Sequence, residues 1–127
     1  MEMVALVTLL LILEYIFFTG LVGKARVEGG IDAPAMVGDP NFERALRVQL
    51  NTAEQLIITI PAMWICGSYF RPDVAAILGV VFFIGRFVYR GQYMREPSSR
   101  LSGMIIGFFA NIGLVLTGAW GVISGLL

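Results

Sequence analysis

The stretch that decides the fold is Asn41 to Gln55, NFERALRVQLNTAEQ. Its polar side chains recur at steps of three, four and three, which places one set on a single face of an α-helix: Arg44, Arg47, Asn51 and Glu54. An apolar run up to Phe70 follows directly. A charged stripe that leads into a hydrophobic span is costly unless it faces protein, water or a ligand. The stripe is therefore a candidate binding site.

The composition is typical of an integral membrane protein. Of the 127 residues, 57% are hydrophobic and 14% are charged, and the mean hydropathy is +0.82. Soluble domains carry about 25% charged residues. The formal net charge is zero, which argues against nucleic acid as a partner. The chain has no histidine, which excludes His-ligated metals, and we expect no metal site.

Four hydrophobic stretches, each of about the 20 residues that a membrane span needs, predict four transmembrane helices. Within a single membrane domain, 1–127, we expect the helices at about residues 3–22, 42–70, 74–93 and 103–127. Turn residues fill the loop from Gly23 to Asn41, and Pro97 interrupts the second polar loop. Short connections favour antiparallel neighbours, so we predict an all-α, up-down bundle of four transmembrane helices.

The basic residues predict the orientation of this bundle. Eight of the nine lie at one end, and only Arg71 lies at the other. The positive-inside rule then places the basic end in the cytoplasm and both termini on the opposite side. We expect the run from Met3 to Val22 to be kept as a helix, because it has no basic n-region and no small-residue cleavage site.

The expected third helix repeats the polar pattern of the second. Arg86, Tyr89, Arg90 and Tyr93 share one helix face, and Arg100 follows seven residues after Tyr93. In antiparallel helices these groups converge at one depth. Arginine binds carboxylates bidentately, so a small ligand with two carboxylates and an amine would suit the site. The alternatives are positive-inside flanks that contact lipid phosphates, and structural pairing between helices.

Glu14 lies in the middle of the first apolar run. An acidic residue at membrane depth is by default a functional candidate. The alternative is a carboxyl group that pairs with an Arg or a Tyr of a neighbouring helix, or that is neutral within the bundle. The sequence leaves both interpretations open.

The pattern F-E-R-x-x-R-V-Q-x-N-x-x-E, from Phe42 to Glu54, resembles the second-helix signature of the MAPEG family (membrane-associated proteins in eicosanoid and glutathione metabolism). Three further matches reinforce it: A-R-V near Arg26, G-R-x-x-Y-x-x-x-Y at Gly85 to Tyr93, and Arg100. The resemblance covers essentially the whole chain. N-T-x-E-Q followed by I-P-A-M-W is more similar to prokaryotic, microsomal-glutathione-transferase-like members, which implies the bacterial inner membrane.

The resemblance implies a homotrimer that holds glutathione, as co-substrate, between neighbouring subunits near the cytoplasmic face. By motif match the glutathione-binding residues would be Arg26, Arg47, Gln49, Asn51, Glu54, Tyr89 and Tyr93. Arg100 matches the arginine assigned to the glutathione thiol and would be catalytic. A thiol with a pKa of about 8.5 is only a few per cent thiolate at neutral pH, and a guanidinium favours the anion. The thiolate would then attack a lipophilic electrophile or reduce a lipid hydroperoxide.

The sequence also departs from parts of the family. Gln55 stands where leukotriene-forming members have Tyr, and the third helix lacks the His of prostaglandin-forming members. Some relatives keep the fold but only bind lipid, so a non-catalytic lipid-binding scaffold is the second hypothesis. A small multidrug transporter is the third, because such proteins also have four helices and a mid-membrane Glu. Their short loops and lack of a charged second-helix stripe argue against it.

Overall fold

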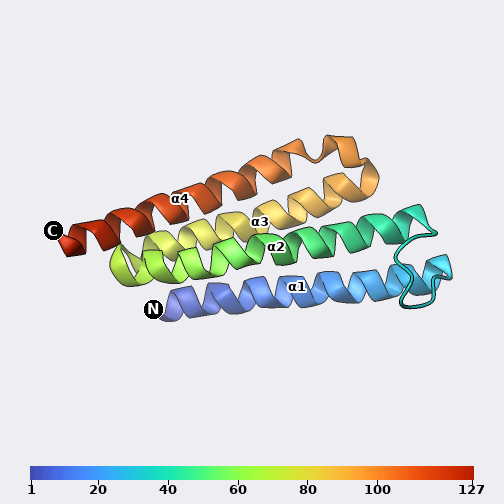
Figure 1. Cartoon of the computed structure of the whole chain (residues 1–127), viewed down its shortest axis with the longest axis horizontal. Helices are drawn as coiled ribbons and strands as arrows, with labels where there is room; N and C mark the ends of the chain where they lie inside the picture. Colours follow the sequence, from blue (N-terminus) through green and yellow to red (C-terminus); the bar gives the residue numbers. More distant parts are fainter.

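The computed structural model describes all 127 residues, which form four α-helices and one short 3-10 helix (Figure 1). The elements are α1 (Glu2–Gly29), α2 (Pro40–Tyr69), α3 (Pro72–Arg95), η1 (Pro97–Ser99) and α4 (Leu101–Leu126). The helices run alternately in opposite directions, and both termini lie at the same end of the bundle (Figure 1). The prediction of an all-α chain with four helices is confirmed.

Three of the four helices are long and apolar enough to cross a membrane, namely α1, α3 and α4. Helix α2 is the longest, at 30 residues, but its N-terminal half carries the charged stripe. Glu43, Arg44, Arg47 and Glu54 lower the hydropathy of that half. The expected set of four apolar spans therefore holds for three helices, and α2 combines a polar half with an apolar half.

Helix α1 is longer than the sequence predicts, because it ends at Gly29 rather than at Val22. The hydropathy falls after Val22, but Lys24, Ala25 and Glu28 are good helix formers, so the helix continues beyond the apolar run. It stops where Gly30 takes a left-handed conformation with φ of 66°. Arg26 therefore lies in the last turn of α1 and not in a loop.

The other helices each begin two residues before the expected start. Two of these starts are prolines. The backbone N–H at the first helical position has no partner within the helix, so a proline there costs no hydrogen bond. In α2, Pro40 is preceded by Asp39, whose carboxylate accepts a hydrogen bond of 2.9 Å from the backbone N–H of Phe42. This N-cap fixes the point at which the polar stripe enters the bundle.

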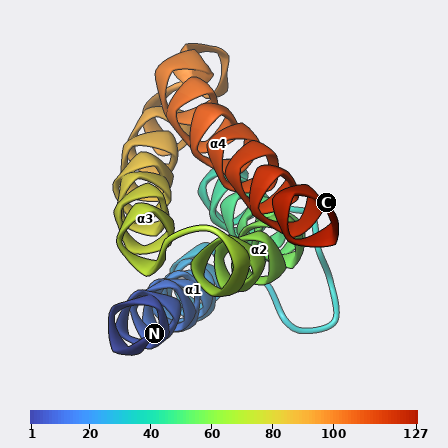
Figure 2. The same cartoon turned by 90° about the vertical axis from the view of Figure 1, so that its left-hand side faces the viewer.

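Helix α2 packs against all three other helices and lies in the middle of the bundle when it is viewed end-on (Figure 2). The largest cluster of buried apolar residues joins the four helices and includes Leu11, Met63, Phe82 and Leu114, none of which is exposed. This core lies in the half of the bundle near the termini, which leaves the other half for polar groups.

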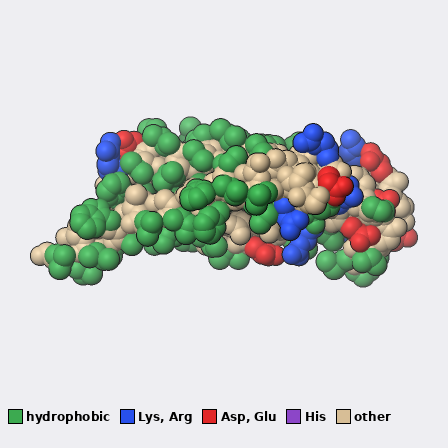
Figure 3. Space-filling model, turned by 90° about the horizontal axis from the view of Figure 1, so that it is seen from above, with side chains coloured by type: hydrophobic (Ala, Val, Ile, Leu, Met, Phe, Trp, Pro, Cys, Tyr) green, Lys and Arg blue, Asp and Glu red, His purple; other side chains and the backbone are tan.

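The surface of the bundle also divides into an apolar part and a polar part. Charged side chains gather at the end that holds the α1–α2 and α3–α4 connections, while apolar side chains cover most of the rest (Figure 3). At the opposite end Arg71 and Asp73 form an isolated ion pair with an N–O distance of 2.6 Å. The bundle thus has one polar end and a long apolar flank.

Candidate functional site

A cavity of about 500 Å³ lies between α2, α3 and the start of α4. Its volume falls within the range of about 300–1,000 Å³ that is common for small-molecule sites. Three arginines and no acidic residue are in its lining, which consists of Arg47, Asn51, Gln55, Arg86, Tyr89, Tyr93, Arg100, Met104, Gly107 and Phe108. The cavity is therefore suited to an anionic ligand.

Arg86 organises the centre of this cavity from α3. Its Nη2 donates to Asn51 Oδ1 at 2.9 Å and to Thr52 Oγ1 at 3.0 Å, and its side chain is only 2% exposed. The guanidinium carbon lies 4.2 Å from the centre of the Tyr89 ring, within the distance of a cation–π contact. Because Asn51 Oδ1 accepts from Arg86, the amide nitrogen of Asn51 remains a donor for a ligand.

Tyr89 and Tyr93 form the wall on α3. Their rings stack with centroids 5.6 Å apart and planes tilted by 30°. Tyr89 is 3% exposed and packs with Phe18 of α1 and Val48 of α2. The packing against Phe18 and Val48 holds the Tyr89 ring in place. Because the Tyr93 ring stacks on it, Tyr93 has a defined position as well.

Arg100 enters the cavity from the junction of η1 and α4. Its Nη1 donates to the carbonyl oxygen of Pro97 at 2.7 Å, while the side chain is otherwise exposed. Gln92 steadies the junction, because its Oε1 accepts a hydrogen bond of 3.0 Å from the backbone N–H of Gly103. The ion pairs of the chain involve neither Arg47, Arg86 nor Arg100. The positive charges of Arg47 and Arg100 are therefore available to a ligand, whereas that of Arg86 also acts on the buried Glu14.

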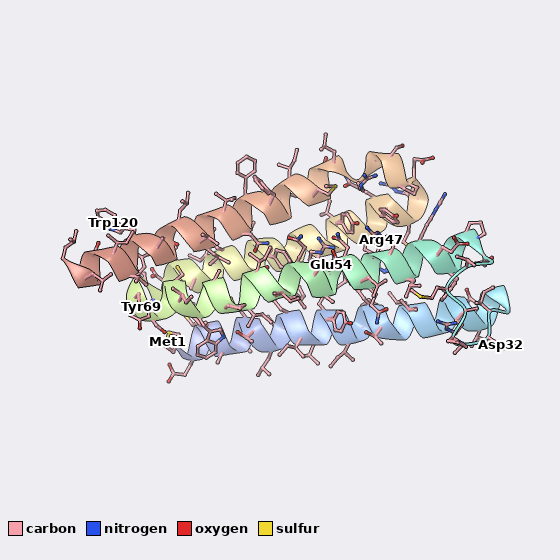
Figure 4. All side chains as sticks on the ribbon, viewed as in Figure 1. Met1, Asp32, Arg47, Glu54, Tyr69 and Trp120 are labelled. Atoms are coloured by element: carbon pink, nitrogen blue, oxygen red, sulfur yellow. The ribbon has the colours of Figure 1, made fainter.

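Five of the eight predicted site residues line the cavity: Arg47, Asn51, Tyr89, Tyr93 and Arg100. The other three lie elsewhere. Gln49 faces α1, where its Nε2 donates to Thr19 Oγ1 at 3.0 Å. Arg26 donates to the carbonyl oxygen of Ala35 at 2.8 Å, and Glu54 is exposed and has no hydrogen-bond partner. Figure 4 shows Arg47 and Glu54 on α2.

The cavity also includes residues that the sequence did not single out as ligands. The periodicity of α3 places Arg86 on the face of Tyr89 and Tyr93, as predicted, although the family motif match does not assign it to glutathione. Met104 and Phe108 follow Arg100 at helical steps of four, which also predicts a shared face. Gln55 follows Arg47 and Asn51 at the same steps of four, so the periodicity of α2 also predicts its place on that face.

Glu14 lies behind the cavity on α1 and is 2% exposed. Neither of its carboxylate oxygens has a hydrogen-bond partner, and the buried Nε of Arg86 has none either. Arg86 is the charged group that acts on Glu14 electrostatically. The direct pairing with an Arg or a Tyr that the second interpretation includes is not observed, because Glu14 forms neither an ion pair nor a hydrogen bond.

Comparison with known proteins identifies the family. The model of the MAPEG family matches residues 4–120. The chain is 39% identical over 112 residues to an uncharacterized protein of Synechocystis sp., which is 88% of this chain and 82% of that protein. It is 34% identical over 125 residues to microsomal glutathione S-transferase 2 of Homo sapiens, covering 98% of this chain and 85% of the relative. The leukotriene C4 synthase of Cavia porcellus is 34% identical over 100 residues, which are 79% and 67% of the two chains.

The chain therefore belongs to the MAPEG family, as its second-helix motif predicts. Together with the three apolar helices, membership of this family indicates a membrane protein. The relatives include proteins named microsomal glutathione S-transferase 2 and leukotriene C4 synthase, so the chain is similar to enzymes as well as to an uncharacterized protein.

Proposed function

We propose that the chain is a glutathione-dependent membrane transferase that also has peroxidase activity. It activates glutathione as a thiolate, which attacks a lipophilic electrophile or reduces a lipid hydroperoxide. Two relatives named for glutathione transfer and for leukotriene C4 synthesis support this proposal at 34% identity. The transporter alternative has no support from the family match, which covers residues 4–120.

One observation carries the proposal: three guanidinium groups converge on one cavity without a carboxylate in its lining. Glutathione has two carboxylates and a thiol, so it needs both cationic partners and a group that favours the sulfur anion. Arg47 and Arg86 bind the carboxylate end, since guanidinium groups match carboxylates bidentately. Asn51 and the two tyrosines provide the neutral hydrogen bonds.

Arg100 is the group proposed to act on the thiol. A single hydrogen bond to the Pro97 carbonyl orients its guanidinium, which leaves the other N–H donors free for the sulfur. Lowering a thiol pKa by about two units corresponds to roughly 2.7 kcal/mol in favour of the thiolate. The remaining rate enhancement comes from holding the thiolate next to the apolar substrate, which arrives from the bilayer.

We propose a homotrimer in which glutathione lies between subunits. Arg26, Gln49 and Glu54 match the family motif but lie outside the cavity of a single chain. The exposure of Glu54 and Arg47 supports a site that a neighbouring subunit completes.

The proposed location is the bacterial inner membrane, with four spanning helices. The cavity end faces the cytoplasm, and both termini face the opposite side. The gathering of charged side chains at the end distant from the termini supports this orientation (Figure 3).

The decisive test is glutathione binding to the purified protein in detergent, with the thiolate followed by ultraviolet difference absorbance. We expect the wild type to bind glutathione and give a thiolate signal. Arg100→Ala should lose most of the thiolate and at least about tenfold in turnover, while binding weakens less. Arg95→Ala is the matched control, because Arg95 lies at the same end of the bundle but outside the cavity.

Equal thiolate and turnover in the wild type and Arg100→Ala would contradict the mechanism. Absence of glutathione binding would instead favour the lipid-binding scaffold. The structure offers one feature for that second function, an apolar groove of about 370 Å³ between α2 and α4. Retention of lipid without affinity for glutathione would identify it.

A further inference from the structure

A second cavity, of about 270 Å³, lies at the polar end of the bundle between α1, α2 and α3. Half of its lining is apolar, and the polar half consists of Lys24, Glu28, Asn41 and Arg90. It shares no residue with the candidate site, which α2 and α3 form with α4 instead of α1. The proposed catalysis therefore leaves this second cavity without a function.

Arg90 brings an unpaired positive charge into the second cavity. The polar pattern of α3 groups it with Tyr89 and Tyr93, but Arg90 lines the second cavity and not the first. Its side chain is half-buried, its guanidinium carbon lies 5.8 Å from the centre of the Phe18 ring, and it takes part in none of the ion pairs of the chain. Such a guanidinium is suited to bind the oxygens of an anion.

Lys24 and Glu28 present charges of both signs from α1. Nζ of Lys24 lies 3.9 Å from Oε1 of Glu28, which is too far for a hydrogen bond, and both side chains are more than half exposed. An exposed pair of this kind contributes little to stability, so both groups can exchange it for a ligand. The cavity thus offers two cations for an anionic group and one carboxylate for an ammonium group.

An exposed aromatic surface continues from the second cavity along the apolar flank. The rings of Phe17 and Phe87 are 53% and 40% exposed, and their centroids are 6.2 Å apart. Phe87 lies about one turn before Arg90, and Phe17 lies about two turns before Lys24. Because α1 and α3 both run toward the polar end, these rings lie nearer the middle of the bundle than the cavity does (Figure 1). Charged groups followed by an apolar surface suit an amphiphilic ligand.

The second cavity lies on a side of the bundle that the proposed trimer leaves to the membrane. Helices α1 and α3 lie side by side, with α4 away from α1 (Figure 2). Arg26, which we assign to the contact between subunits, is two residues from Lys24, or about 200° around α1. The two side chains therefore point to opposite sides of the helix.

We propose that the second cavity binds the headgroup of a phospholipid that carries a primary amine, as phosphatidylethanolamine does. Arg90 and Lys24 donate to the phosphate, and the carboxylate of Glu28 accepts from the ammonium group. The acyl chains lie against Phe17 and Phe87. Basic cavities between transmembrane helices on the cytoplasmic side are a general means of binding lipid headgroups.

Two related lipids separate the contributions of the phosphate and the amine. Phosphatidylcholine has the same charges, but its quaternary ammonium has no N–H that could donate to Glu28. Phosphatidylglycerol has the phosphate and no positive charge, so its headgroup cannot compensate the carboxylate. A cavity that contained only basic groups would favour phosphatidylglycerol, whereas the carboxylate of Glu28 favours the primary amine.

The test counts the lipids that each chain retains, by native mass spectrometry of the full-length protein in dodecyl maltoside. The protein is incubated with an equimolar mixture of the dioleoyl forms of the three lipids. We expect the wild type to retain phosphatidylethanolamine about tenfold over each of the others, because a hydrogen bond to a charged group contributes a factor of this order. Free O-phosphoethanolamine, the headgroup without acyl chains, is added as a competitor and should not displace the lipid at equal concentration.

Three variants assign the contacts to residues. Arg90→Gln should lower the retention of all three lipids about tenfold, and Lys24→Gln should lower it as well. Glu28→Gln should remove the preference for phosphatidylethanolamine over phosphatidylcholine. Arg95→Gln is the matched control, because Arg95 lies at the same end of the bundle but lines neither cavity, and it should behave as the wild type does.

The outcomes decide this inference independently of glutathione. Equal retention of the three lipids by the wild type, or a preference for phosphatidylglycerol, would overturn it. Wild-type retention in Arg90→Gln would overturn the phosphate contact, and if that variant does not fold, the exposed Lys24 provides the same test. Displacement by an equal concentration of O-phosphoethanolamine would identify a soluble phosphate ester, rather than a lipid, as the occupant. Each of these results leaves the proposed transferase function untouched.

Discussion

Arg86 is the most constrained single residue of the site. It is 2% exposed and holds Asn51 and Thr52 by hydrogen bonds, yet its Nε has no partner. Glu14 is equally buried and also has no hydrogen bond. Arg86 acts on Glu14 electrostatically, although no ion pair or hydrogen bond joins the two side chains. Glu14 thus connects α1 to the site without lining the cavity.

This coupling is measurable by a double-mutant cycle. Glu14→Gln and Arg86→Gln should each destabilise the protein, because each removes one of two buried groups that act on each other electrostatically. The double variant should be more stable than the sum of the single effects predicts, with a coupling of about 1–2 kcal/mol. Unfolding in detergent, followed by the helical circular dichroism signal, provides the four free energies. Strictly additive effects would show that the two residues do not interact.

At this scale the sequence predicts the residues that share a helix face but not their partners. Arg47, Asn51 and Arg100 could be placed in one site because helical spacing and antiparallel packing bring them to one depth. Asn111 could not, since an isolated amide in an apolar run contains no information about which helix it contacts. Its link to Gln55 depends on the register of α4 against α2, which is a property of the packed bundle.

At the scale of elements, the contact between α3 and α4 depends on a glycine. A Cβ at Gly103 would collide with the backbone of Tyr89, so this position lets the two helices approach closely at the rim of the cavity. Gly121, at the other end of α4, allows a similarly close approach to the end of α2, because a Cβ there would collide with the carbonyl group of Tyr69. The position of Arg100 depends on the first of these contacts, because Arg100 lies just before α4.

Gly103→Ala should therefore weaken both the fold and the site. The added methyl group must push α4 away from α3, which we expect to cost about 1–3 kcal/mol and to weaken glutathione binding. Gly125→Ala is the matched control, because a Cβ there meets no atom within 4 Å. Thermal unfolding in detergent and a glutathione titration check both variants. Equal behaviour of the two alanines would contradict this account of the helix contact.

The helix bounds show where hydropathy is informative and where it is not. Hydropathy places the starts of α2, α3 and α4 within two residues, and the prolines at the first positions of α2 and α3 mark where those two helices actually begin. The end of α1 is seven residues later than expected, because the apolar run ends at Val22 but the helix continues to Gly29. Hydropathy reports the segment that suits the membrane, whereas the backbone continues until Gly30 provides a stop.

At the scale of the whole molecule, the single chain leaves part of the family motif outside its cavity. Arg26, Gln49 and Glu54 belong to the predicted glutathione-binding set but face other surroundings. The sequence could not distinguish a site within one chain from a site shared between copies, because a motif match says nothing about which subunit provides each residue. The proposed homotrimer accounts for the three residues together.

Mixed assemblies test this arrangement. Chains with Glu54→Ala and chains with Arg100→Ala should each be inactive alone. When they are co-expressed with different tags and purified through both, a site between subunits can combine an intact Glu54 with an intact Arg100. We expect a partial recovery of conjugation activity. Activity no higher than that of the two variants measured separately would contradict a shared site.

The ion pair between Arg71 and Asp73 has a consequence for the biogenesis of the protein. These residues lie at the tip of the α2–α3 hairpin, and the 2.6 Å contact leaves the tip with no net charge. Passage of such a tip across a bilayer avoids most of the penalty that an isolated arginine carries. The opposite end carries eight basic residues, and Lys and Arg next to membrane spans resist translocation. In the proposed orientation, the α2–α3 hairpin is therefore the part of the chain that crosses the membrane during insertion.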